Sequence, residues 1–358
     1  MSNTTNGRVT IREVAKLAGV SPSTVSLVLN GKVDRMSAET HERVMQAVSD
    51  LGYATNQMAR GLKVGYVPMI GLVVPTVANP FWGEFARIVE NAAMARNHQV
   101  LLCNSERVAE RERRYVESLL ARGITGIILG SSPLSLKHLA GATKRGLKVV
   151  AFDRMVSGEG EVTLDSVSVE NAHGISLATQ HLIDLGHKRI GFVSGPVSST
   201  SRRDRLEGFM QTMQRSGLPV PPESVWMEGP PPGLPDEEAT EIGRIAALSL
   251  LRRDNRPTAI IAINDMTAVG VYAGARELGM NIPRDLSVVG FDDIHLCKIV
   301  SPQLTTVRQP LEQLILSAVE LLFARMSGES VEDAKQRTFP PSLVVRESTS
   351  TPGDVISL

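Results

Sequence analysis

Short apolar runs recur along most of the chain, and stretches of helical periodicity separate them. The first four runs are MIGLVV (69–74), QVLLC (99–103), TGIIL (125–129) and LKVVAF (147–152). Continuous apolar runs of this length are typical of parallel strands that are buried on both faces. Residues 81–97 and 108–122, which lie between them, have the spacing of amphipathic helices. The alternation therefore predicts a doubly wound α/β lobe with a parallel sheet.

The same alternation begins again after about residue 170. Further strands are predicted at KRIGFVS (188–194), TAIIAI (258–263) and LSVVGF (286–291), and a surface loop at EGPPPGLPDEE (228–238). A chain of 358 residues is also too long for one small core, so two or three folding units are expected. We therefore expect a second doubly wound parallel-sheet lobe.

Ahead of these lobes, the segment TIREVAKLAGVSPSTVSLVLNG (10–31) predicts two short helices. Thr10 and Glu13 have the spacing of a capping box, and Gly19 stands where a helix end favours a left-handed residue. Ser21 can cap the second helix, and Pro22 suits its first turn. The pattern is typical of two helices joined by a tight turn.

The second of these helices begins with short hydroxyl residues, which are Ser21, Ser23, Thr24 and Ser26. Such side chains allow a helix N-terminus to approach the major groove closely, and they can donate to phosphates or base edges. With a third helix capped by Ser37, the pattern predicts an all-α helix–turn–helix head. The alternative is an ordinary helical hairpin whose hydroxyl groups face water.

Charge is spread unevenly, although the whole chain has a formal net charge of zero. Residues 1–66 contain eight basic and five acidic residues, so this part carries about +3 and the remainder about −3. A positive head mildly favours a polyanion such as DNA as its partner.

Several other classes of protein are disfavoured. The N-terminus has no hydrophobic signal core and no apolar run reaches about 18 residues, which predicts a soluble cytoplasmic protein without a membrane span. The two cysteines, Cys103 and Cys297, lie far apart and suggest no disulfide framework. No dinucleotide fingerprint, phosphate loop or G-x-S-x-G elbow occurs, and the histidines show no metal-ligand spacing. We therefore expect no enzyme, no cofactor and no metal.

Polar and aromatic side chains follow five of the predicted strands. They are Asn79, Phe81 and Trp82; Asp153 and Arg154; Arg202, Arg203 and Arg205; Asn264 and Asp265; and Asp292 and Asp293. Ligands of open α/β sheets bind beyond the carboxyl ends of the strands, and this mixture of groups is typical of a polyol site. A single Asp there is more often a helix N-cap, which suits Asp265 and Asp293. Arg202 and Arg203 are expected to form a solvated basic face.

The segment at residues 10–31, together with LGYATNQMARGLK (51–63), resembles the head and hinge of the lactose-repressor/galactose-repressor (LacI) family of bacterial transcription regulators. The resemblance continues to about residue 347. It implies a helix–turn–helix domain at 1–55, a hinge helix and linker at 56–66, a periplasmic-binding-protein-like core at 67–347 and a tail at 348–358. In such a core the chain crosses between the lobes three times. The lobes are expected at about 67–168 with 310–330, and at about 169–309 with 331–347.

The resemblance also implies which residues contact DNA. Ser23 and Thr24 resemble contacting positions of the recognition helix, whereas many members have polar base readers in place of Pro22 and Leu27. Leu27 could touch a thymine methyl group but cannot make a bidentate guanine contact. Arg35 resembles a contact in the variable wing. The full predicted set is Thr10, Ser21, Pro22, Ser23, Thr24, Leu27, Arg35, Ala59, Leu62 and Lys63.

The hinge NQMARGLK (56–63) is a weak helix, because it is short and Gly61 costs roughly 1 kcal/mol relative to Ala. In the family, paired hinge leucines wedge into a minor-groove step and kink the duplex. Leu62 matches this leucine, Lys63 a flanking minor-groove contact, and Ala59 the small residue where two hinges approach. The alternative is an ordinary linker in which Leu62 covers the core.

For the effector, the resemblance points to Asp153, Arg154, Arg205, Asp265 and Asp292, and it adds Asn79, Phe81, Trp82 and Gln309. Arg205 is also a candidate clamp between the lobes. Carboxylate and guanidinium groups favour a sugar or sugar derivative as the effector, and a purine-type corepressor is the alternative.

We therefore predict a homodimeric transcriptional regulator, expected to be a repressor, that binds a near-palindromic operator with an affinity set by a small effector. The effector could either release the operator or strengthen its binding. Two other classes stay open as alternatives. A periplasmic-type sugar carrier would need a signal peptide and no head, and a sugar-processing enzyme would turn over a sugar.

Overall fold

The computed structural model describes residues 9–29, 36–53, 68–154, 164–229, 239–328 and 334–353. The chain divides between residues 67 and 68 into two compact units, which we call the head and the core. The predicted hinge at 56–66 lies outside the described residues.

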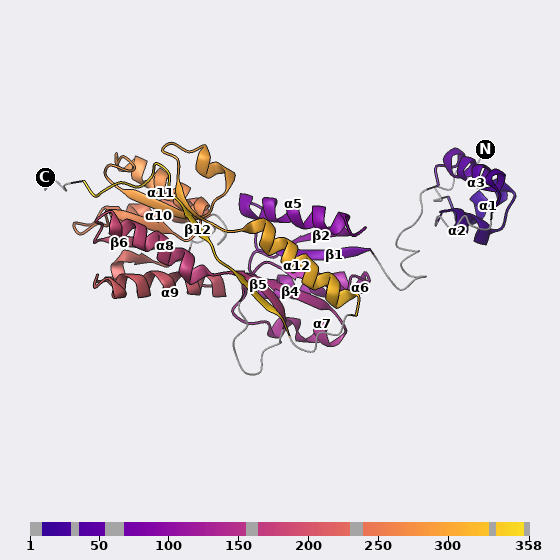
Figure 1. Cartoon of the computed structure of the whole chain (residues 1–358), viewed down its shortest axis with the longest axis horizontal. Coiled ribbons are helices and arrows are strands. Elements are labelled where there is room, and N and C mark those ends of the chain that lie inside the picture. The colour runs from indigo at the N-terminus through magenta and orange to yellow at the C-terminus, as the bar shows by residue number, and fades with distance from the viewer. Residues whose placement is uncertain are drawn as a thin grey trace, which may run out of the picture. The chain divides into compact units, whose positions relative to one another are not determined.

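The described part of the head contains α1 (Ile11–Ala18), α2 (Pro22–Leu29) and α3 (Ala38–Asp50) (Figure 1). These helices pack around Val14, Val25 and Val44, whose side chains are fully buried. Gly19 ends α1 with a φ of 65°, and its N–H donates to the carbonyl of Ala15. The predicted helix–turn–helix head is therefore confirmed.

The first lobe of the core is built on a parallel sheet with the strand order β11-β5-β4-β3-β1-β2. Its strands are β1 (Met69–Val74), β2 (Gln99–Asn104), β3 (Gly126–Leu129), β4 (Lys148–Phe152), β5 (Asp165–Val169) and β11 (Gln336–Phe339). Its helices are α5 (Pro80–Met94), α6 (Ala109–Ala121), η1 (Lys137–Leu139), α7 (Ala140–Lys144) and α12 (Leu311–Met326).

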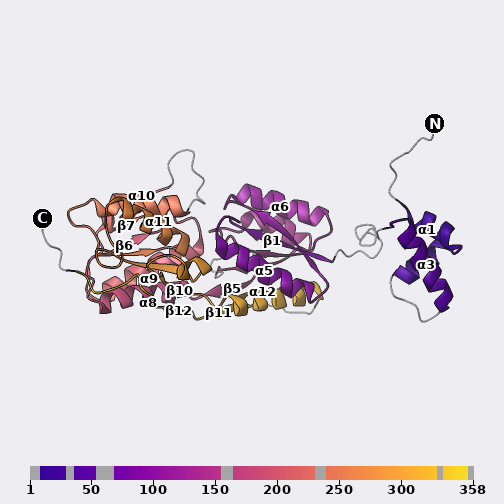
Figure 2. The same cartoon turned by 90° about the horizontal axis from the view of Figure 1, so that it is seen from above.

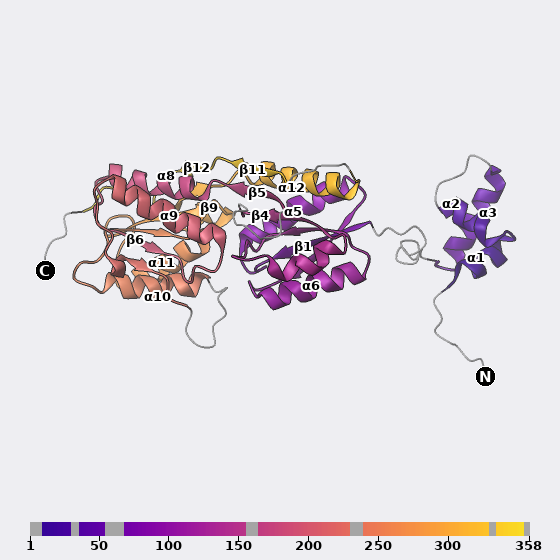
Figure 3. The same cartoon turned by 90° about the horizontal axis from the view of Figure 1, so that it is seen from below.

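Successive side chains of β1 point to opposite faces of this sheet, as in any pleated strand. Leu72 packs with α5 and α12, whereas Val73 packs with α6. Figures 2 and 3 show α12 and α6 on opposite sides of β1. Both faces of the central strand are thus covered, which is why its sequence is a continuous apolar run.

The second lobe has the strand order β12-β10-β9-β8-β6-β7, in which only the β10–β12 pair is antiparallel among the described strands. The strands are β6 (Ile190–Val193), β7 (Val225–Trp226), β8 (Ala259–Ala262), β9 (Ser287–Asp292), β10 (Thr305–Arg308) and β12 (Ser342–Val344). The helices are α8 (Asn171–Asp184), α9 (Thr200–Arg215), η2 (Pro222–Ser224), α10 (Ala239–Leu251), α11 (Asp265–Glu277) and η3 (His295–Lys298).

Glycines let the helices of this lobe approach each other at the level of the backbone. A Cβ on Gly243 of α10 would lie 2.0 Å from the carbonyl oxygen of Thr267 in α11, and one on Gly270 of α11 would lie 1.9 Å from that of Thr240 in α10. Any larger residue at either position would force the two helices apart. The predicted two-lobed parallel α/β architecture is confirmed.

The chain crosses between the lobes after β5, after β10 and after β11, but the third crossing differs from the prediction. Residues 331–347 were assigned to the second lobe, whereas β11 pairs with β5 in the sheet of the first lobe. The change of lobe comes at residues 340–341, between β11 and β12. Two prolines stand there, and they cannot donate to a ladder.

The predicted tail also begins too early. Ser348 is fully buried, and its hydroxyl donates to the carbonyl of Val288 at 2.6 Å. The main chain of Ser350 accepts from His187, which is itself buried. Residues 348–350 therefore belong to the second lobe. None of the described helices is both long enough and apolar enough to cross a membrane.

Candidate functional site

The N-terminus of α2 presents a compact group of hydroxyl side chains. Ser21 Oγ accepts from the N–H of Thr24 at 3.1 Å, so it caps the helix. The same oxygen lies 2.6 Å from Ser23 Oγ and 2.8 Å from Thr24 Oγ1. Ser21, Pro22, Ser23 and Leu27 are exposed, and Thr24 is half-buried. These predicted DNA-contacting residues thus share one accessible surface at the start of the recognition helix.

Thr10 lies instead at the start of α1, where its N–H and hydroxyl both donate to the carboxylate of Glu13, at 2.7 and 2.8 Å. These hydrogen bonds lower the pKa of Glu13. The predicted contacts Arg35, Ala59, Leu62 and Lys63 lie outside the described residues.

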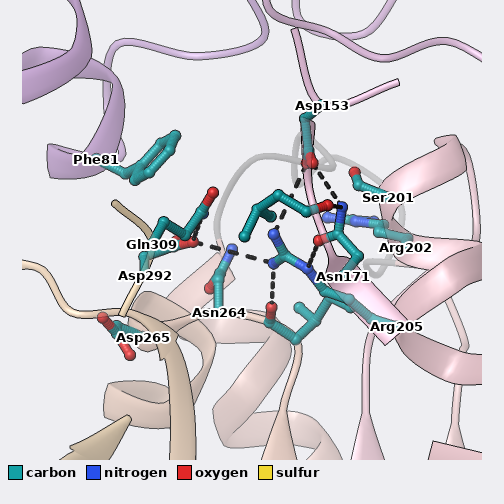
Figure 4. A network of polar contacts seen from close by, with 12 residues as sticks. Phe81, Asp153, Asn171, Ser201, Arg202, Arg205, Asn264, Asp265, Asp292 and Gln309 are labelled. Atoms are coloured by element: carbon teal, nitrogen blue, oxygen red, sulfur yellow. Dashed lines mark hydrogen bonds and ion pairs between the residues drawn. The ribbon is translucent and has the colours of Figure 1, made fainter. Parts of the chain in front are cut away.

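In the core, the carboxyl ends of the strands of both lobes meet a network of polar side chains centred on Arg205 of α9 (Figure 4). The guanidinium group of Arg205 donates to Asn171 Oδ1 and to the carbonyl of Ile263, both at 2.7 Å. It lies over the ring of Phe291, 3.6 Å from the centroid, in cation–π geometry. Arg205 is therefore held on three sides.

Two carboxylates, one from each lobe, flank this guanidinium group. Arg205 Nη2 is 3.7 Å from Asp153 Oδ2 in the first lobe, and Nη1 is 4.0 Å from Asp292 Oδ1 in the second. Asn171 donates to Asp153 Oδ1 at 2.5 Å, and the hydroxyl of Ser168 lies 3.3 Å from the same oxygen. The predicted set Asp153, Arg205 and Asp292 is thus brought together, with Arg205 between the lobes.

Gln309 joins this network at the second crossing between the lobes. Its Nε2 donates to Asp292 Oδ1 at 2.7 Å. Gln309 is 5% exposed, and its Oε1 accepts no hydrogen bond within the described part of the chain. A buried oxygen without a donor is costly, so this atom suits a ligand hydroxyl or amide.

The protonation of Asp292 follows from its burial. Loss of water raises the pKa of this carboxyl group to about 8, and this effect exceeds the lowering by Arg205 and Gln309. A neutral Asp292 can donate as well as accept a hydrogen bond.

The backbone is strained at these strand ends. Asp153 has a φ of 55°, Asp292 of 119° and Asp293 of 56°. Non-glycine residues in this region cost about 1–3 kcal/mol each and cluster at functional sites. The three residues directly follow or end β4 and β9, where the sequence predicted a ligand site.

Two predicted effector residues lie away from the network. Asp265 is fully buried in the second lobe, where its carboxylate accepts from Thr306 Oγ1 at 2.5 Å and from the N–H of Ile294 at 2.9 Å. Burial raises the pKa of Asp265 to about 6. Trp82 packs in the core of the first lobe, with its ring 5.2 Å from that of Phe85, and a Cβ on Gly130 would lie 2.6 Å from it. Both side chains have structural roles.

The other residues predicted at the strand ends differ in whether they lie near the network. Asn79 caps α5 by accepting from the N–H of Phe81, and Figure 4 draws Phe81 on the same side of the network as Gln309 and Asp292. Arg154 is buried, and its Nη2 donates to the carbonyl of Leu134 at 3.4 Å. Arg202 does not belong to a solvated face as predicted, because it is 7% exposed and donates to the carbonyl of Pro196.

The sequence patterns do not predict Asn171 of this network, and they place Asn264 at a strand end without including it in the effector set. Asn171 follows β5, a strand whose sequence DSVSV is too polar to be predicted as buried. Asn264, instead of Asp265, is the N-cap of α11, and its Oδ1 accepts from the N–H of Thr267 at 2.8 Å. The strand-end pattern had pointed to both Asn264 and Asp265, but only Asn264 faces the network (Figure 4).

Close to this network, a cavity of about 550 Å³ opens between α5 and α12. Asp292 and Gln309 line it, whereas Asp153 and Arg205 do not. The lobes also touch directly: the N–H of Thr200 donates to the carbonyl of Ser132 at 3.1 Å. No group of three His, Cys, Asp or Glu side chains that could hold a metal occurs within the described ranges.

A helix–turn–helix head and a two-lobed core with a polar network at the strand ends define a class of protein, the DNA-binding regulators with a ligand-binding core. Residues 10–56 match the model of bacterial regulatory proteins of the lacI family, and residues 179–349 match a periplasmic binding protein-like domain. The chain is 34% identical over 345 residues to the HTH-type transcriptional repressor PurR of Pasteurella multocida (strain Pm70), covering 96% of this chain and 99% of that protein.

Solved structures agree. The lac repressor dimer bound to operator and the anti-inducer ONPF has a TM-score of 0.81 and 28% identity, covering 96% of this chain and 100% of that one. The complex of the transcriptional regulator CelR with cellobiose has a TM-score of 0.69 and 29% identity, covering 95% and 100%. The chain therefore belongs to the LacI family of bacterial transcription regulators. It is a DNA-binding regulator and not an enzyme.

Proposed function

We propose that the chain is a cytoplasmic repressor that binds a near-palindromic operator as a homodimer, and that a sugar or sugar derivative bound between the lobes controls its affinity for DNA. The observation that carries this proposal is the position of Arg205, which contacts Asp153 in one lobe and Asp292 in the other. A ligand that engages these three groups stabilises one spacing of the lobes over another.

The chemistry of the network supports a polyhydroxyl ligand. Asp153 supplies carboxylate oxygens as acceptors, and the guanidinium group of Arg205 supplies donors in a fixed geometry. Gln309 Oε1 is a buried acceptor that can accept a hydrogen bond from a ligand. Sugar hydroxyl groups both donate and accept, so they complement all three. The similarity to the CelR structure, which contains cellobiose, gives independent support to a sugar.

On the DNA side, we propose that α2 enters the major groove with Ser21, Ser23 and Thr24 against phosphates or base edges, and with Leu27 against a thymine methyl group. Arg35 is assigned to the wing, and Ala59, Leu62 and Lys63 to the minor groove, on their resemblance to family positions. Dimerisation, as in the lac repressor dimer on its operator, would place two heads on successive half-sites.

Effector and operator are coupled through the spacing of the lobes in this proposal. Closure of the core around a ligand changes the distance between the two hinges, and so changes how well they fit one operator. Such couplings amount to about 1–3 kcal/mol, or roughly 5–150-fold in affinity. The direction of the change depends on which spacing fits the operator.

A two-stage experiment tests this function. Sugars, sugar phosphates and purines are first screened for compounds that raise the melting temperature of the full-length protein, because a ligand specific to the folded state stabilises it. Compounds that pass are then tested for a change in operator affinity. A sugar that stabilises the protein and shifts operator binding supports the proposal, and a response to purines alone contradicts the assigned effector class.

Deletion of residues 1–63 provides the matching control. The truncated core should lose operator binding and keep the thermal shift caused by the effector, because the core is a compact unit of its own. Loss of both would contradict the proposed division of labour between head and core.

A further inference from the structure

A second cavity, of about 250 Å³, lies in the second lobe at the amino ends of its strands. The start of β6, the segment before β7 and the end of α10 surround it. Its walls include Pro219, Pro221 and Pro257, and we call it the proline pocket. It is distinct from the network around Arg205, because that network lies at the carboxyl ends of the same strands.

The floor of the proline pocket is apolar and rigid. Ile190 and Leu250, which line it, are 2% and 1% exposed and belong to the main hydrophobic core. Each proline fixes its own φ, so the walls lose little entropy when a partner binds. The pocket is thus preformed.

The rim of the pocket is basic. Lys188, Arg189 and Arg253 line it and are exposed. Two further basic residues, Arg252 and Arg256, lie in the same stretch of chain as Arg253. In the segments that surround the pocket (188–190, 219–224 and 250–257), the acidic residues are Glu223 and Asp254. The surroundings therefore carry a local charge of about +3, in a chain whose formal net charge is zero.

The basic groups of this rim differ from several other arginines of the described residues. Arg87, Arg244 and Arg284 each pair with a neighbouring carboxylate. Within the described residues, Lys188, Arg189 and Arg253 form no such ion pair. Arg189 and Arg253 donate to main-chain carbonyls, of Arg256 at 3.1 Å and Glu223 at 2.5 Å, which orient the guanidinium groups and leave their charge available to an anionic partner.

We propose that the proline pocket is a docking site for an acidic segment of a partner protein, which inserts one apolar side chain between the prolines. At about 250 Å³ the pocket lies just below the usual range of about 300–1,000 Å³ for small-molecule pockets, and its exposed basic rim favours an acidic peptide. The basic rim selects Asp and Glu on either side of the anchor. A DNA backbone fits less well, since the floor formed by Ile190, Leu250 and the prolines has apolar side chains that complement an apolar group better than a phosphate.

Fluorescence anisotropy with the full-length protein tests this assignment. The probe is a fluorescein-labelled nonapeptide with a central Phe and four Asp or Glu residues on each side. Saturable binding is expected, and replacing Phe by Ser in the peptide should weaken it at least about tenfold, because the anchor then no longer buries apolar surface. Equal binding of the Ser peptide would overturn the proposal.

Charge reversals on the rim locate the site. Lys188→Glu should weaken the Phe peptide about three- to tenfold, and Glu223→Lys should strengthen it by a similar factor. Arg252→Glu is the matched control, because Arg252 is exposed and adjacent in the chain to Arg253 but does not line the pocket. An equal loss in Lys188→Glu and Arg252→Glu would indicate non-specific charge attraction and overturn the assignment. Displacement of the peptide by duplex DNA in a variant that lacks operator binding would overturn it in favour of a nucleic-acid surface.

Discussion

The Nε of Arg205 donates to Oδ1 of Asn171 at 2.7 Å, and this hydrogen bond joins α9 to the start of α8. Arg205 lies in α9 of the second lobe, whereas Asn171 stands where the chain first crosses between the lobes. The other end of the Asn171 amide donates to Asp153 in the first lobe. One amide side chain thus links a carboxylate of the first lobe to a guanidinium group of the second, and a change in lobe spacing alters the hydrogen bond between Asn171 and Asp153.

Replacement of Arg205 by Ala should abolish the response to the effector while a folded dimer persists. The variant loses the hydrogen bonds to Asn171 and to the Ile263 carbonyl, which should lower the free energy of unfolding by about 1–3 kcal/mol. Operator binding with and without effector gives the readout, and thermal melting gives the stability. Arg203→Ala is the control, since Arg203 is exposed. A normal effector response in Arg205→Ala would refute the assignment.

Replacement of Asn171 by Leu, which has nearly the same shape, should weaken effector binding about tenfold, or about 1.4 kcal/mol. The variant leaves Arg205 and Asp153 in place but removes the amide that orients both. Isothermal titration of the effector measures the change. The exposed Gln214→Leu on α9 serves as the control. Unchanged affinity in Asn171→Leu would show that the amide does not position the network.

The stability of the second lobe should depend on pH through His187. This ring is 2% exposed and contacts Thr258 Oγ1 at 2.8 Å, Ser287 Oγ at 3.0 Å and the Ser350 carbonyl at 2.9 Å. Burial lowers the pKa of His187 below its ordinary value of 6.5. The unfolded chain therefore binds this proton more readily, so the stabilisation is complete above pH 6.5 and is lost as the pH falls through the lowered pKa.

Urea unfolding of the wild type and of His187→Gln checks this prediction. The variant should be less stable by about 1–3 kcal/mol above pH 7, and the difference should shrink as the pH falls toward 5.5. Comparing the two proteins removes the contributions of Asp265 and Asp292, whose raised pKa values act in the opposite direction. His173→Gln, at an exposed position of α8, is the control. A difference that stays constant with pH would disprove the assignment.

Leu62 was assigned to the minor groove on the resemblance of the hinge to the family pattern. Leu62→Ala should weaken operator binding roughly tenfold and reduce the bend in the DNA, because the smaller side chain cannot keep the base step unstacked. Gel mobility of circularly permuted operator fragments measures the bend. Met58→Ala, in the same hinge segment, is the matched control. An unchanged bend in Leu62→Ala would remove the wedge role.

Most of the architecture was predictable from the sequence because buried parallel strands leave continuous apolar runs. MIGLVV and LSVVGF became β1 and β9, as the pattern indicated. By contrast, QVLLC became the edge strand β2, where Leu102 is 43% exposed, because a local run does not reveal a strand's place in the sheet. The strands β5 and β11 contain polar residues instead of a continuous apolar run, and β11 pairs with β5 from a distant part of the chain, so no local signal predicted them.

The site was predictable in type and less so in detail. The strand-end pattern and the family resemblance both pointed to Asp153, Arg205 and Asp292, because ligands of open α/β sheets bind beyond the carboxyl ends of the strands. The pattern could not separate Asn264 from Asp265, since a difference of one residue in the start of α11 decides which side chain faces the network.

The central claim is that this protein reads a particular DNA sequence and that a small ligand controls the reading. The most direct measurement is selection of duplexes from a randomised library by the full-length protein, followed by affinity measurements with and without sugars. We predict enrichment of a near-palindromic sequence, with an affinity that at least one sugar shifts by about 5–150-fold. Binding of the selected and random duplexes with equal affinity under all these conditions would contradict the account.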